Sequence, residues 1–365
     1  QKQGVSNLTT RQSRKLDHLR HTLELADGPA DSGFSDITLI HNCLPELKLD
    51  EVSLETDCAG MRLPHPVIIN AMTGGAAGLT AVNARLAEVA SRTGAVMAVG
   101  SQFVALQQPE VAESFLIVRQ VNPDGLIWGN IGAYATVDQA RQVVDMIRAD
   151  ALQVHLNAAQ EISMPEGDAD FCGWLRRIEQ MVHQLSVPVI VKETGCGMGM
   201  EQIRMLSAVG VAAVDIGGAG GTNFLAIENF RTGQKLSQDL LAWGIPTAVS
   251  ALEAIEVLPP TTDLIVSGGV RTPLDAAKAL AIGAAAVGIA APLLRLTEQS
   301  DVAAAVLWLE QYLKTLKKLA LLLGRQSVAE LRSQPMLIGG KTSAWLSARG
   351  IAVDKYARRN PAGER

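Results

Sequence analysis

The sequence predicts an α/β protein folded as a (β/α)₈ TIM barrel, with an N-terminal arm and a C-terminal helical extension. Between residues 66 and 300, about eight short apolar runs alternate with amphipathic segments of helical periodicity. That alternation, in a chain of 365 residues, is typical of a closed parallel barrel. A doubly wound open sheet is the alternative, but it would place one Gly-rich fingerprint early, whereas here Gly-rich turns recur and are densest late.

Composition and charge exclude several classes of protein. Hydrophobic residues make up 48% of the chain and charged residues 19%, which fits a well-buried globular core. The formal net charge of -5 argues against a general nucleic-acid surface. The cysteines lack the spacing of a zinc site or a disulfide framework. The polar start and the lack of a long uncharged apolar run predict neither a secretory signal nor a membrane span, so we expect a cytoplasmic protein.

We expect a single domain made of three parts. Residues 1–65 form the N-terminal arm and a lead-in segment, residues 66–300 form the barrel, and residues 301–365 form the helical extension that packs on it. Within the extension, a long amphipathic pattern at 302–323 and a short one at 328–331 precede a Gly/Ser-rich tail.

The N-terminal arm is basic, and residues 14–25 have the pattern of a short helix. This helix would carry Arg14, Lys15 and His18 on nearby turns. The arm is either a solvated, frayed terminus or a basic segment that folds over an anionic substrate.

Barrel strands are expected where short apolar runs end in small or polar residues. These runs are 66–70, 95–99, 126–129, 151–156, 187–191, 212–216, 264–266 and 285–289. The helices expected between them are 79–92, 110–121, 137–147, 171–185, 200–208, 245–257 and 273–281. The segment 245–257 could hold an extra strand at 247–250, but its Ala, Leu and Glu content suits a helix better.

Gly-rich turns follow the last three predicted strands, at 217–223, 267–271 and 288–291. Glycine lets backbone N–H groups approach an oxyanion closely, and the Thr222 hydroxyl adds a donor. One such turn is weak evidence, because turns need glycine anyway. Three in succession predict a phosphate site of the kind that barrels build from their last loops and a helix N-terminus.

Polar or small groups follow the earlier strands at matching positions. Ala71, Met72 and Thr73 follow the first strand, while Ser101 and Asn130 follow the second and third. Lys192 ends the fifth strand and either faces the site or lies at the surface. Together with one phosphate site, this set fits flavin mononucleotide (FMN), whose electron-rich ring a lysine would stabilise.

The stretch 153–161 gathers an imidazole, amides and a carboxylate at the end of the fourth strand. His155 and Asn157 alternate, which puts both on one face of an extended segment. The alternative for His155 is a core histidine with satisfied hydrogen bonds. Glu161 is either a hard oxygen ligand for Mg²⁺ or an ordinary surface acid.

These motifs together resemble the type 2 isopentenyl-diphosphate isomerases, which depend on FMN. From about residue 14 to residue 350 they keep the order of that family: Arg14-Lys15 with His18, MTGG, GSQ, NIG, QVHLNAAQE, VKETG, DIGGAGGTNF with IENFR, and SGGVR with DAAKALAIGA. The Gly-rich turns are shared with other FMN barrels, whereas HLN with QE, MTGG and the N-terminal Arg-Lys are more specific. Phe103 departs from the pattern, since some members place a basic residue after GSQ.

The resemblance implies an isomerase that interconverts isopentenyl diphosphate and dimethylallyl diphosphate by a 1,3-allylic proton shift. Reduced FMN would act as acid and base, Mg²⁺ would hold the diphosphate and NADPH would reduce the flavin. The family also implies a homotetramer or homo-octamer. Because an amide is a poor acid or base near neutral pH, we expect flavin nitrogen to handle at least one proton, with Gln160 orienting or relaying.

The same resemblance implies residue roles. Gln160 is the catalytic residue, and Glu161 is the metal ligand. The expected substrate contacts are Arg14, Lys15, His18, Ser101, His155, Asn157 and Gln160. The expected flavin contacts are Ala71, Met72, Thr73, Ser101, Asn130, Lys192, Thr222, Gly268, Gly269, Arg271, Ala290 and Ala291.

Two other interpretations remain open at this point. One is an FMN-dependent 2-hydroxyacid oxidase or dehydrogenase, a class that abstracts a proton with a strand-end His and binds a carboxylate with Arg. The other is a non-catalytic flavin-binding or phosphate-binding protein.

Overall fold

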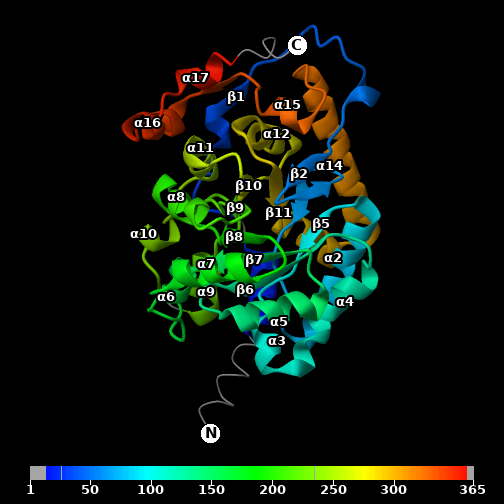
Figure 1. Cartoon of the computed structure of the whole chain (residues 1–365), viewed down its shortest axis with the longest axis vertical. Helices are drawn as coiled ribbons and strands as arrows, with labels where there is room; N and C mark the ends of the chain where they lie inside the picture. The colour runs from blue at the N-terminus through cyan, green and yellow to red at the C-terminus, as the bar shows by residue number, and fades with distance from the viewer. Residues whose placement is uncertain (1–13, 26, 234, 360–365) are drawn as a thin grey trace.

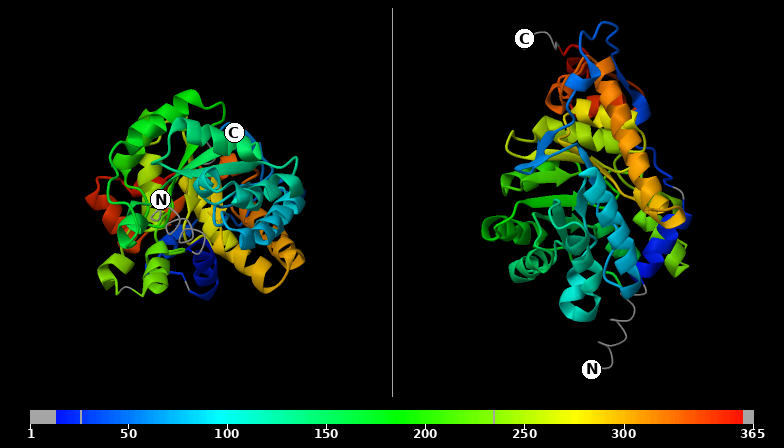
Figure 2. Two further views of the ribbon diagram at one scale, coloured as in Figure 1. Left: turned by 90° about the horizontal axis from the view of Figure 1, so that it is seen from below. Right: turned by 90° about the vertical axis from the view of Figure 1, so that its right-hand side faces the viewer.

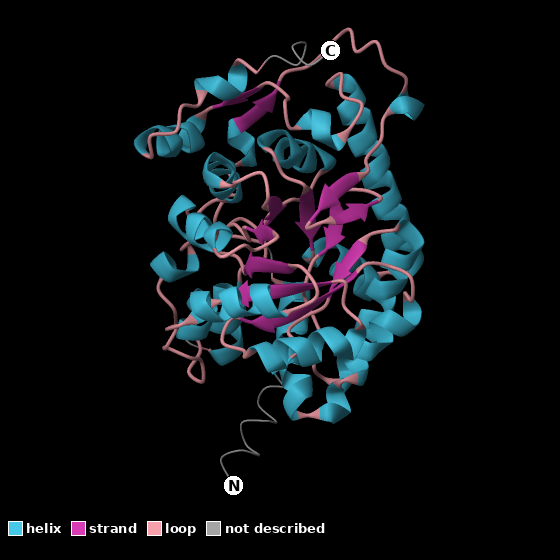
Figure 3. Cartoon of the chain, viewed as in Figure 1, coloured by secondary structure: helices cyan, strands magenta, loops and turns pink. Residues whose placement is uncertain are grey.

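The computed structural model describes residues 14–25, 27–233 and 235–359, so the predicted arm before residue 14 lies outside the described residues. Within them, eight parallel strands close into a barrel in the order β10-β11-β4-β5-β6-β7-β8-β9, which confirms the predicted fold. Figure 3 shows the strands surrounded by helices. The strands are β4 (Val67–Ile69), β5 (Val96–Ala98), β6 (Ile127–Gly132), β7 (Ala151–Leu156), β8 (Val189–Glu193), β9 (Ala213–Asp215), β10 (Asp263–Ser267) and β11 (Ala286–Ile289).

A helix follows each barrel strand. In chain order these are α2 (Thr80–Thr93), α4 (Glu113–Val121), α5 (Val137–Ile147), α7 (Trp174–Gln184), α8 (Met200–Ala208), α11 (Thr247–Val257), α12 (Pro273–Ile282) and α13 (Ala291–Gln299). Local sequence specifies some of the starts: the Thr136 and Thr272 side chains cap α5 and α12 by accepting from backbone N–H groups two residues inside the helix start. The segment 245–257, which could have held an extra strand, is helical from Thr247 to Val257, as its composition indicated.

Four short helices that the sequence did not predict lie in the loops after β5, β7 and β9. They are α3 (Phe103–Gln107), α6 (Ala158–Ser163), α9 (Phe224–Thr232) and α10 (Gln238–Leu241). Helices α3, α6 and α10 have only four to six residues, too few turns for a hydrophobic period to stand out. Because they follow the carboxyl ends of the strands, they lie on the face where barrel enzymes hold their active sites.

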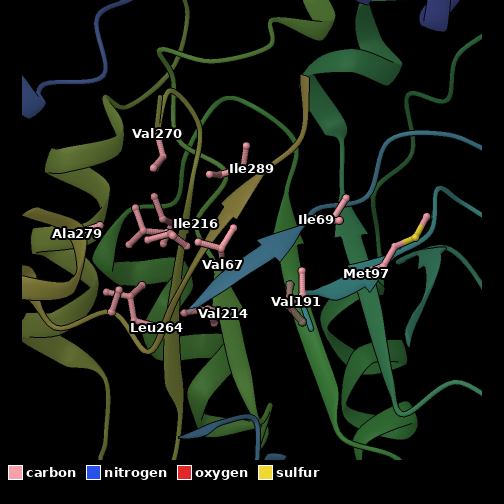
Figure 4. Close-up of a cluster of buried hydrophobic side chains, with 14 of the residues drawn as sticks. Val67, Ile69, Met97, Val191, Val214, Ile216, Leu264, Val270, Ala279 and Ile289 are labelled. Carbon is pink, nitrogen blue, oxygen red and sulfur yellow. The ribbon is translucent and has the colours of Figure 1, made fainter. Parts of the chain in front are cut away.

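Alternation along each strand divides the core into an outer and an inner layer. Outward-facing residues such as Val67, Ile69, Val191 and Val214 are buried in the larger apolar cluster, shown in Figure 4. Inward-facing residues fill the lower interior of the barrel in a separate cluster, which includes Ile68, Val96, Trp128, Ile190 and Ile265. A hairpin of β2 (Thr56–Cys58) and β3 (Met61–Leu63) contributes Cys58 and Leu63 to that cluster and so closes the bottom of the barrel.

The segments before and after the barrel meet in a small sheet. Strand β1 (Ile37–Leu39) pairs antiparallel with β12 (Met336–Ile338), at the opposite end of the molecule from α6 and α9 (Figure 1). Helix α14 (Val302–Leu322), orange in Figure 2, runs along the outside of the barrel against α2 and α12. Beyond it come α15 (Val328–Leu331), α16 (Gly340–Ala348) and α17 (Asp354–Ala357).

Residues 332–359, for which the sequence indicated only a Gly/Ser-rich tail, contain the short elements β12, α16 and α17. Met336, Leu346, Ile351 and Tyr356 are buried there and anchor short elements to the barrel. The apolar runs here are at most three residues long, as in Met336–Ile338, so they show no clear period. Among the described residues, none of the helices combines the length and apolar character that a membrane crossing requires.

Candidate active site

A cavity of about 570 Å³ opens at the carboxyl ends of the barrel strands. Its volume lies in the range of small-molecule sites. Every predicted site residue except Thr73 lines it: Arg14, Lys15, His18, Ala71, Met72, Ser101, Asn130, His155, Asn157, Gln160, Glu161, Lys192, Thr222, Gly268, Gly269, Arg271, Ala290 and Ala291. Thr73 is buried beside it, with a hydroxyl that finds no hydrogen-bond partner within the described part of the chain.

The floor of the cavity is a buried chain of hydrogen bonds that all point the same way. His155 Nδ1 lies 2.9 Å from Asn130 Oδ1, and Asn130 Nδ2 donates to Gln153 Oε1 at 3.2 Å. Gln153 Nε2 then donates to Asn70 Oδ1 at 3.1 Å, and Asn70 Nδ2 donates to Asp215 Oδ2 at 2.7 Å. The carboxylate of Asp215 therefore fixes the orientation of three amides and, through them, of the imidazole.

This chain sets both the tautomer and the charge of His155. Since Asn130 Oδ1 only accepts, the imidazole must donate from Nδ1, which leaves the Nε2 lone pair unprotonated in the neutral ring. Burial and, to a smaller extent, the positive charges of Lys15 and Lys192 together lower the pKa of His155 to about 3. His155 is neutral at pH 7 in this structure.

Lys192 supplies positive charge at the floor. Strand β8 begins and ends two residues later than predicted and carries Lys192 inward, with its Nζ 3.3 Å from Asp215 Oδ2 and 3.0 Å from the Glu193 carbonyl oxygen. Of the two positions left open by the sequence, the structure therefore gives the one facing the site. A buried ammonium at this place suits an electron-rich ring.

In the wall formed by the loops after β9 and β10, the two backbones are in direct contact. A Cβ on Gly268 would lie 2.0 Å from the Gly218 carbonyl oxygen, and one on Gly221 would lie 2.5 Å from the Gly269 nitrogen. Only glycine fits such a crossing, so backbone N–H groups line this wall without side chains in front of them. Helix α13 also begins here, at Ala291. This arrangement fits the phosphate of FMN, and the amide-rich floor fits its polar ring.

The opposite wall is organised by Glu228, a residue of α9 whose side chain is fully buried. Its Oε1 lies 2.6 Å from His18 Nε2 and accepts from Gln160 Nε2 at 2.9 Å, while its Oε2 accepts from Arg231 Nε at 2.6 Å. Glu228 thus joins the N-terminal helix, α6 and α9 at one carboxylate. Arg231 in turn pairs with Glu166 at 2.5 Å.

The charge state of this cluster follows from those contacts. Burial alone would raise the pKa of Glu228, but the hydrogen bonds from His18, Gln160 and Arg231 outweigh burial and lower the pKa to about 2. Burial lowers the pKa of His18 despite its contact with Glu228. The carboxylate is therefore ionised at neutral pH, and it holds the Gln160 amide with its N–H toward Glu228.

Glu161 and Asn157 form a small oxygen-rich group at the edge of the cavity. Glu161 Oε1 accepts from Asn157 Nδ2 at 2.8 Å, and its Oε2 accepts from the backbone N–H of Asp168 at 3.1 Å. Asn157 Oδ1 is buried and has no hydrogen-bond partner within the described residues. Across the same residues, no three His, Cys, Asp or Glu side chains gather to hold a metal. One carboxylate fits Mg²⁺, which commonly takes its other ligands from water and a substrate diphosphate.

Aromatic side chains also line the cavity, and one of them, Phe103, stands where some members of the family have a basic residue. Phe103 packs edge-on against Tyr134 with ring centroids 5.0 Å apart, and both rings line the cavity. Trp174 lines it as well. Three aromatic side chains thus contribute to the lining of the cavity.

Sequence reasoning missed Asn70, Gln153, Asp215 and Glu228. The first three could have been found by extending the period of two inside the barrel, since each lies two positions beyond an inward-facing core residue (Ile68, Ala151 and Ala213). Glu228 lies in the quoted IENFR motif, but no spacing pointed from α9 to the stretch containing Gln160.

Comparison with known proteins agrees with this geometry. A family model described as FMN-dependent dehydrogenase matches residues 133–337. A mandelate oxidase structure with (S)-2-phenylpropionate superimposes with a TM-score of 0.63 at 17% identity, covering 91% of this chain and 98% of that one. A flavocytochrome b2 variant gives a TM-score of 0.65 at 18% identity, covering 92% and 85%. At these identities the structures establish the fold alone. Fold and family model together define an FMN-dependent barrel flavoprotein.

Closer relatives narrow the class. The isopentenyl-diphosphate delta-isomerase of Geobacillus sp. (strain WCH70) is 47% identical over 351 residues, covering 96% of this chain and 100% of that protein. The enzyme of the same name from Symbiobacterium thermophilum is 45% identical over 359 residues, covering 96% and 99%. The chain belongs to the type 2, FMN-dependent isopentenyl-diphosphate delta-isomerase family, as its motifs indicated.

Proposed function

We propose that this enzyme interconverts isopentenyl diphosphate and dimethylallyl diphosphate. The observation that carries the proposal is a single cavity with two unlike walls. One wall, of glycine backbone with a lysine at its floor, suits a flavin. The other, with Arg14, Lys15 and the Glu228 cluster, suits an anionic substrate.

The diphosphate would bind at the mouth, under the N-terminal helix. Arg14 reaches the cavity with its Nη1 3.3 Å from Met164 Sδ, and its Nε is buried without a hydrogen-bond partner among the described residues. A partly buried guanidinium with an unpaired Nε–H is well suited to phosphate oxygens. Lys15, Ser101 and Asn157 line the same cavity and complete the contacts. His155, neutral in this structure, would donate to the diphosphate only once the arriving negative charge raises its pKa.

Gln160 is the group we assign to the reacting carbons. Its amide is anchored by Glu228, so its orientation survives when substrate enters. An amide neither loses nor gains a proton readily at neutral pH. Gln160 would therefore orient the allyl unit or relay a proton, and would not itself act as the acid or base. Reduced FMN, when bound, supplies ring nitrogens that give and accept protons at neutral pH. Lys192 would supply positive charge to that ring, and the aromatic side chains of Phe103 and Tyr134 would limit water at the reacting carbons.

Glu161 would hold Mg²⁺ together with diphosphate oxygens. Its two oxygens are already oriented by Asn157 and by the Asp168 backbone, which preorganises the carboxylate. Glu161→Gln should therefore raise the Mg²⁺ concentration needed for half-maximal activity by at least roughly tenfold. Loss of the Mg²⁺ requirement with activity retained would instead remove Glu161 as the ligand.

We further propose NADPH as the reductant of the flavin, a cytoplasmic location, and a homotetramer or homo-octamer. The exposed apolar side chains of Ile162, Phe230 and Trp243, on or near α6, α9 and α10, support self-association.

The decisive experiment is conversion of isopentenyl diphosphate by the purified protein with FMN, NADPH and Mg²⁺, each omitted in turn. We expect conversion only when all three are present, with deuterium from D₂O entering the product. A 2-hydroxyacid that reduces the bound flavin, while isopentenyl diphosphate gives no product, would favour the oxidase interpretation. Full FMN and Mg²⁺ binding without any deuterium incorporation would favour a binding protein.

A further inference from the structure

The N-terminal helix, residues 14–24, is held at its two ends by different parts of the barrel. Near its start, His18 contacts Glu228 of α9. At its end, Arg295 of α13 donates from Nε to the Thr22 carbonyl oxygen at 3.1 Å and from Nη2 to that of Leu25 at 2.8 Å. Arg295 thus satisfies carbonyl groups that the end of a helix leaves open.

Just beyond the helix, Asp27 forms an ion pair with Arg271 and lies 3.7 Å from Arg295 Nη2. Arg271 belongs to the loop after β10 and lines the cavity. Asp27 Oδ2 contacts both Nε and Nη2 of Arg271. Nη1 of Arg271 donates to the Val270 carbonyl oxygen at 3.3 Å. A guanidinium has five N–H groups, so these contacts leave N–H groups at the far end of Arg271 for a ligand in the cavity.

The backbone that follows Asp27 is packed directly on the glycine wall. The Gly28 N–H donates to the Gly221 carbonyl oxygen at 3.2 Å. A Cβ on Gly220 would lie 2.4 Å from the Ser32 nitrogen, and one on Gly269 would lie 2.9 Å from the Ser32 Cβ. The same loops that face the cofactor therefore also carry the base of the substrate-side helix.

We propose that Asp27 is a positioning residue that couples the two walls of the site. It orients Arg271 toward the phosphate end of the cavity and, by the same ion pair, keeps the helix of residues 14–24 on the cavity mouth. Binding of a phosphate-bearing cofactor and docking of the helix then stabilise each other, because coupling between two sites is reciprocal. This inference rests on the proposed function, since it takes the cofactor to be FMN.

Charge and orientation predict opposite effects of neutralising Asp27 on the affinity for FMN. Asp27 is negative and close to the expected phosphate, so its neutralisation would by charge alone tighten FMN binding. If orientation of Arg271 dominates, neutralisation weakens FMN binding instead. The sign of the change therefore decides between positioning and simple charge.

The test compares the full-length wild type with Asp27→Asn and Asp27→Glu, all stripped of flavin. Asp17→Asn is the matched control, because it also removes one negative charge, here from the N-terminal helix, at a residue that has no hydrogen bond or ion pair to the described residues. Flavin fluorescence quenching gives the Kd for FMN, and tryptic cleavage after Lys15 and Arg20, with and without FMN, reports docking of the helix. Circular dichroism melting confirms that each variant is folded.

We expect FMN to slow cleavage of the wild type and of Asp17→Asn by roughly tenfold, within the usual range of coupling between sites. In Asp27→Asn the Kd for FMN should rise by a similar factor and cleavage should no longer respond to FMN, with partial recovery in Asp27→Glu. An unchanged or lower Kd in Asp27→Asn, or unchanged protection by FMN, overturns the proposal while leaving the proposed function intact. A wild type that binds no FMN overturns the proposed function itself.

Discussion

Replacing Glu228 with Gln tests how far one buried carboxylate organises the substrate wall. The variant keeps the shape of the side chain but removes the charge that faces His18, Gln160 and Arg231. A pKa held at about 2 instead of 4.5 corresponds to roughly 3 kcal/mol of stability at pH 7. Because the folded-state pKa is lowered, this stabilisation is complete well above pH 4.5 and is lost as the pH falls toward 2.

The size of the effect can be followed by urea unfolding at several pH values. Glu228→Gln should lower the free energy of unfolding by roughly 3 kcal/mol at pH 7, and the difference from wild type should shrink by about 1 kcal/mol at pH 4. Activity should fall about 10- to 100-fold in kcat/KM, because hydrogen bonds to a charged group contribute about 1.5–3 kcal/mol each.

The matched control is Glu166→Gln, which removes the other acid on Arg231 but touches neither His18 nor Gln160. Glu166 is one-third exposed, so its loss should cost less than about 1 kcal/mol and leave kcat nearly unchanged. The reasoning is refuted if the destabilisation by Glu228→Gln is the same at pH 7 and pH 4, or if the control loses as much activity.

Three further outcomes are expected. Gly269→Ala should weaken FMN binding at least roughly tenfold in a fluorescence titration, since its Cβ would lie 2.5 Å from a facing carbonyl oxygen; Gly173→Ala, at a similar φ with open space, should cost only about 1 kcal/mol of backbone strain. Gln160→Ala and Gln160→Glu, the latter facing Glu228, should both lower turnover with the flavin absorbance spectrum unchanged, and unchanged turnover in both removes Gln160 from the mechanism. With the pKa of His155 lowered to about 3, the unfolded chain binds one more proton between pH 3 and 6.5, so the free energy of unfolding should rise with pH there, and His155→Gln should flatten that rise in urea titrations.

Much of the fold was predictable because long elements carry their own periodicity. The predicted bounds of α5, β7 and α8 agree with the structure, since each is a strong amphipathic or apolar run with a clear start and end. The strands β1 and β12 were not predictable, because three residues show no period and their pairing links distant parts of the chain. Short elements of this kind are fixed by tertiary contacts and not by local propensity.

Some residues of the candidate site could be predicted from the sequence, and others could not. Residues at strand ends, such as Lys192 and His155, could be found from the barrel pattern, because all carboxyl ends of parallel strands meet at one face. Glu228 and Asp27 could not, because their partners lie 68 positions away at Gln160 and 244 positions away at Arg271. A single sequence gives no measure of such distances in space.

The small sheet that joins the segments before and after the barrel has a consequence for biosynthesis. Strand β1 leaves the ribosome early, whereas its partner β12 is made about 300 residues later. Until then, the edge that carries Ile37 and Leu39 has no strand to pair with, and unpaired apolar edges recruit other chains. A nascent chain that lacks Met336–Ile338 therefore leaves the edge of β1 unpaired, and synthesis of β12 covers it.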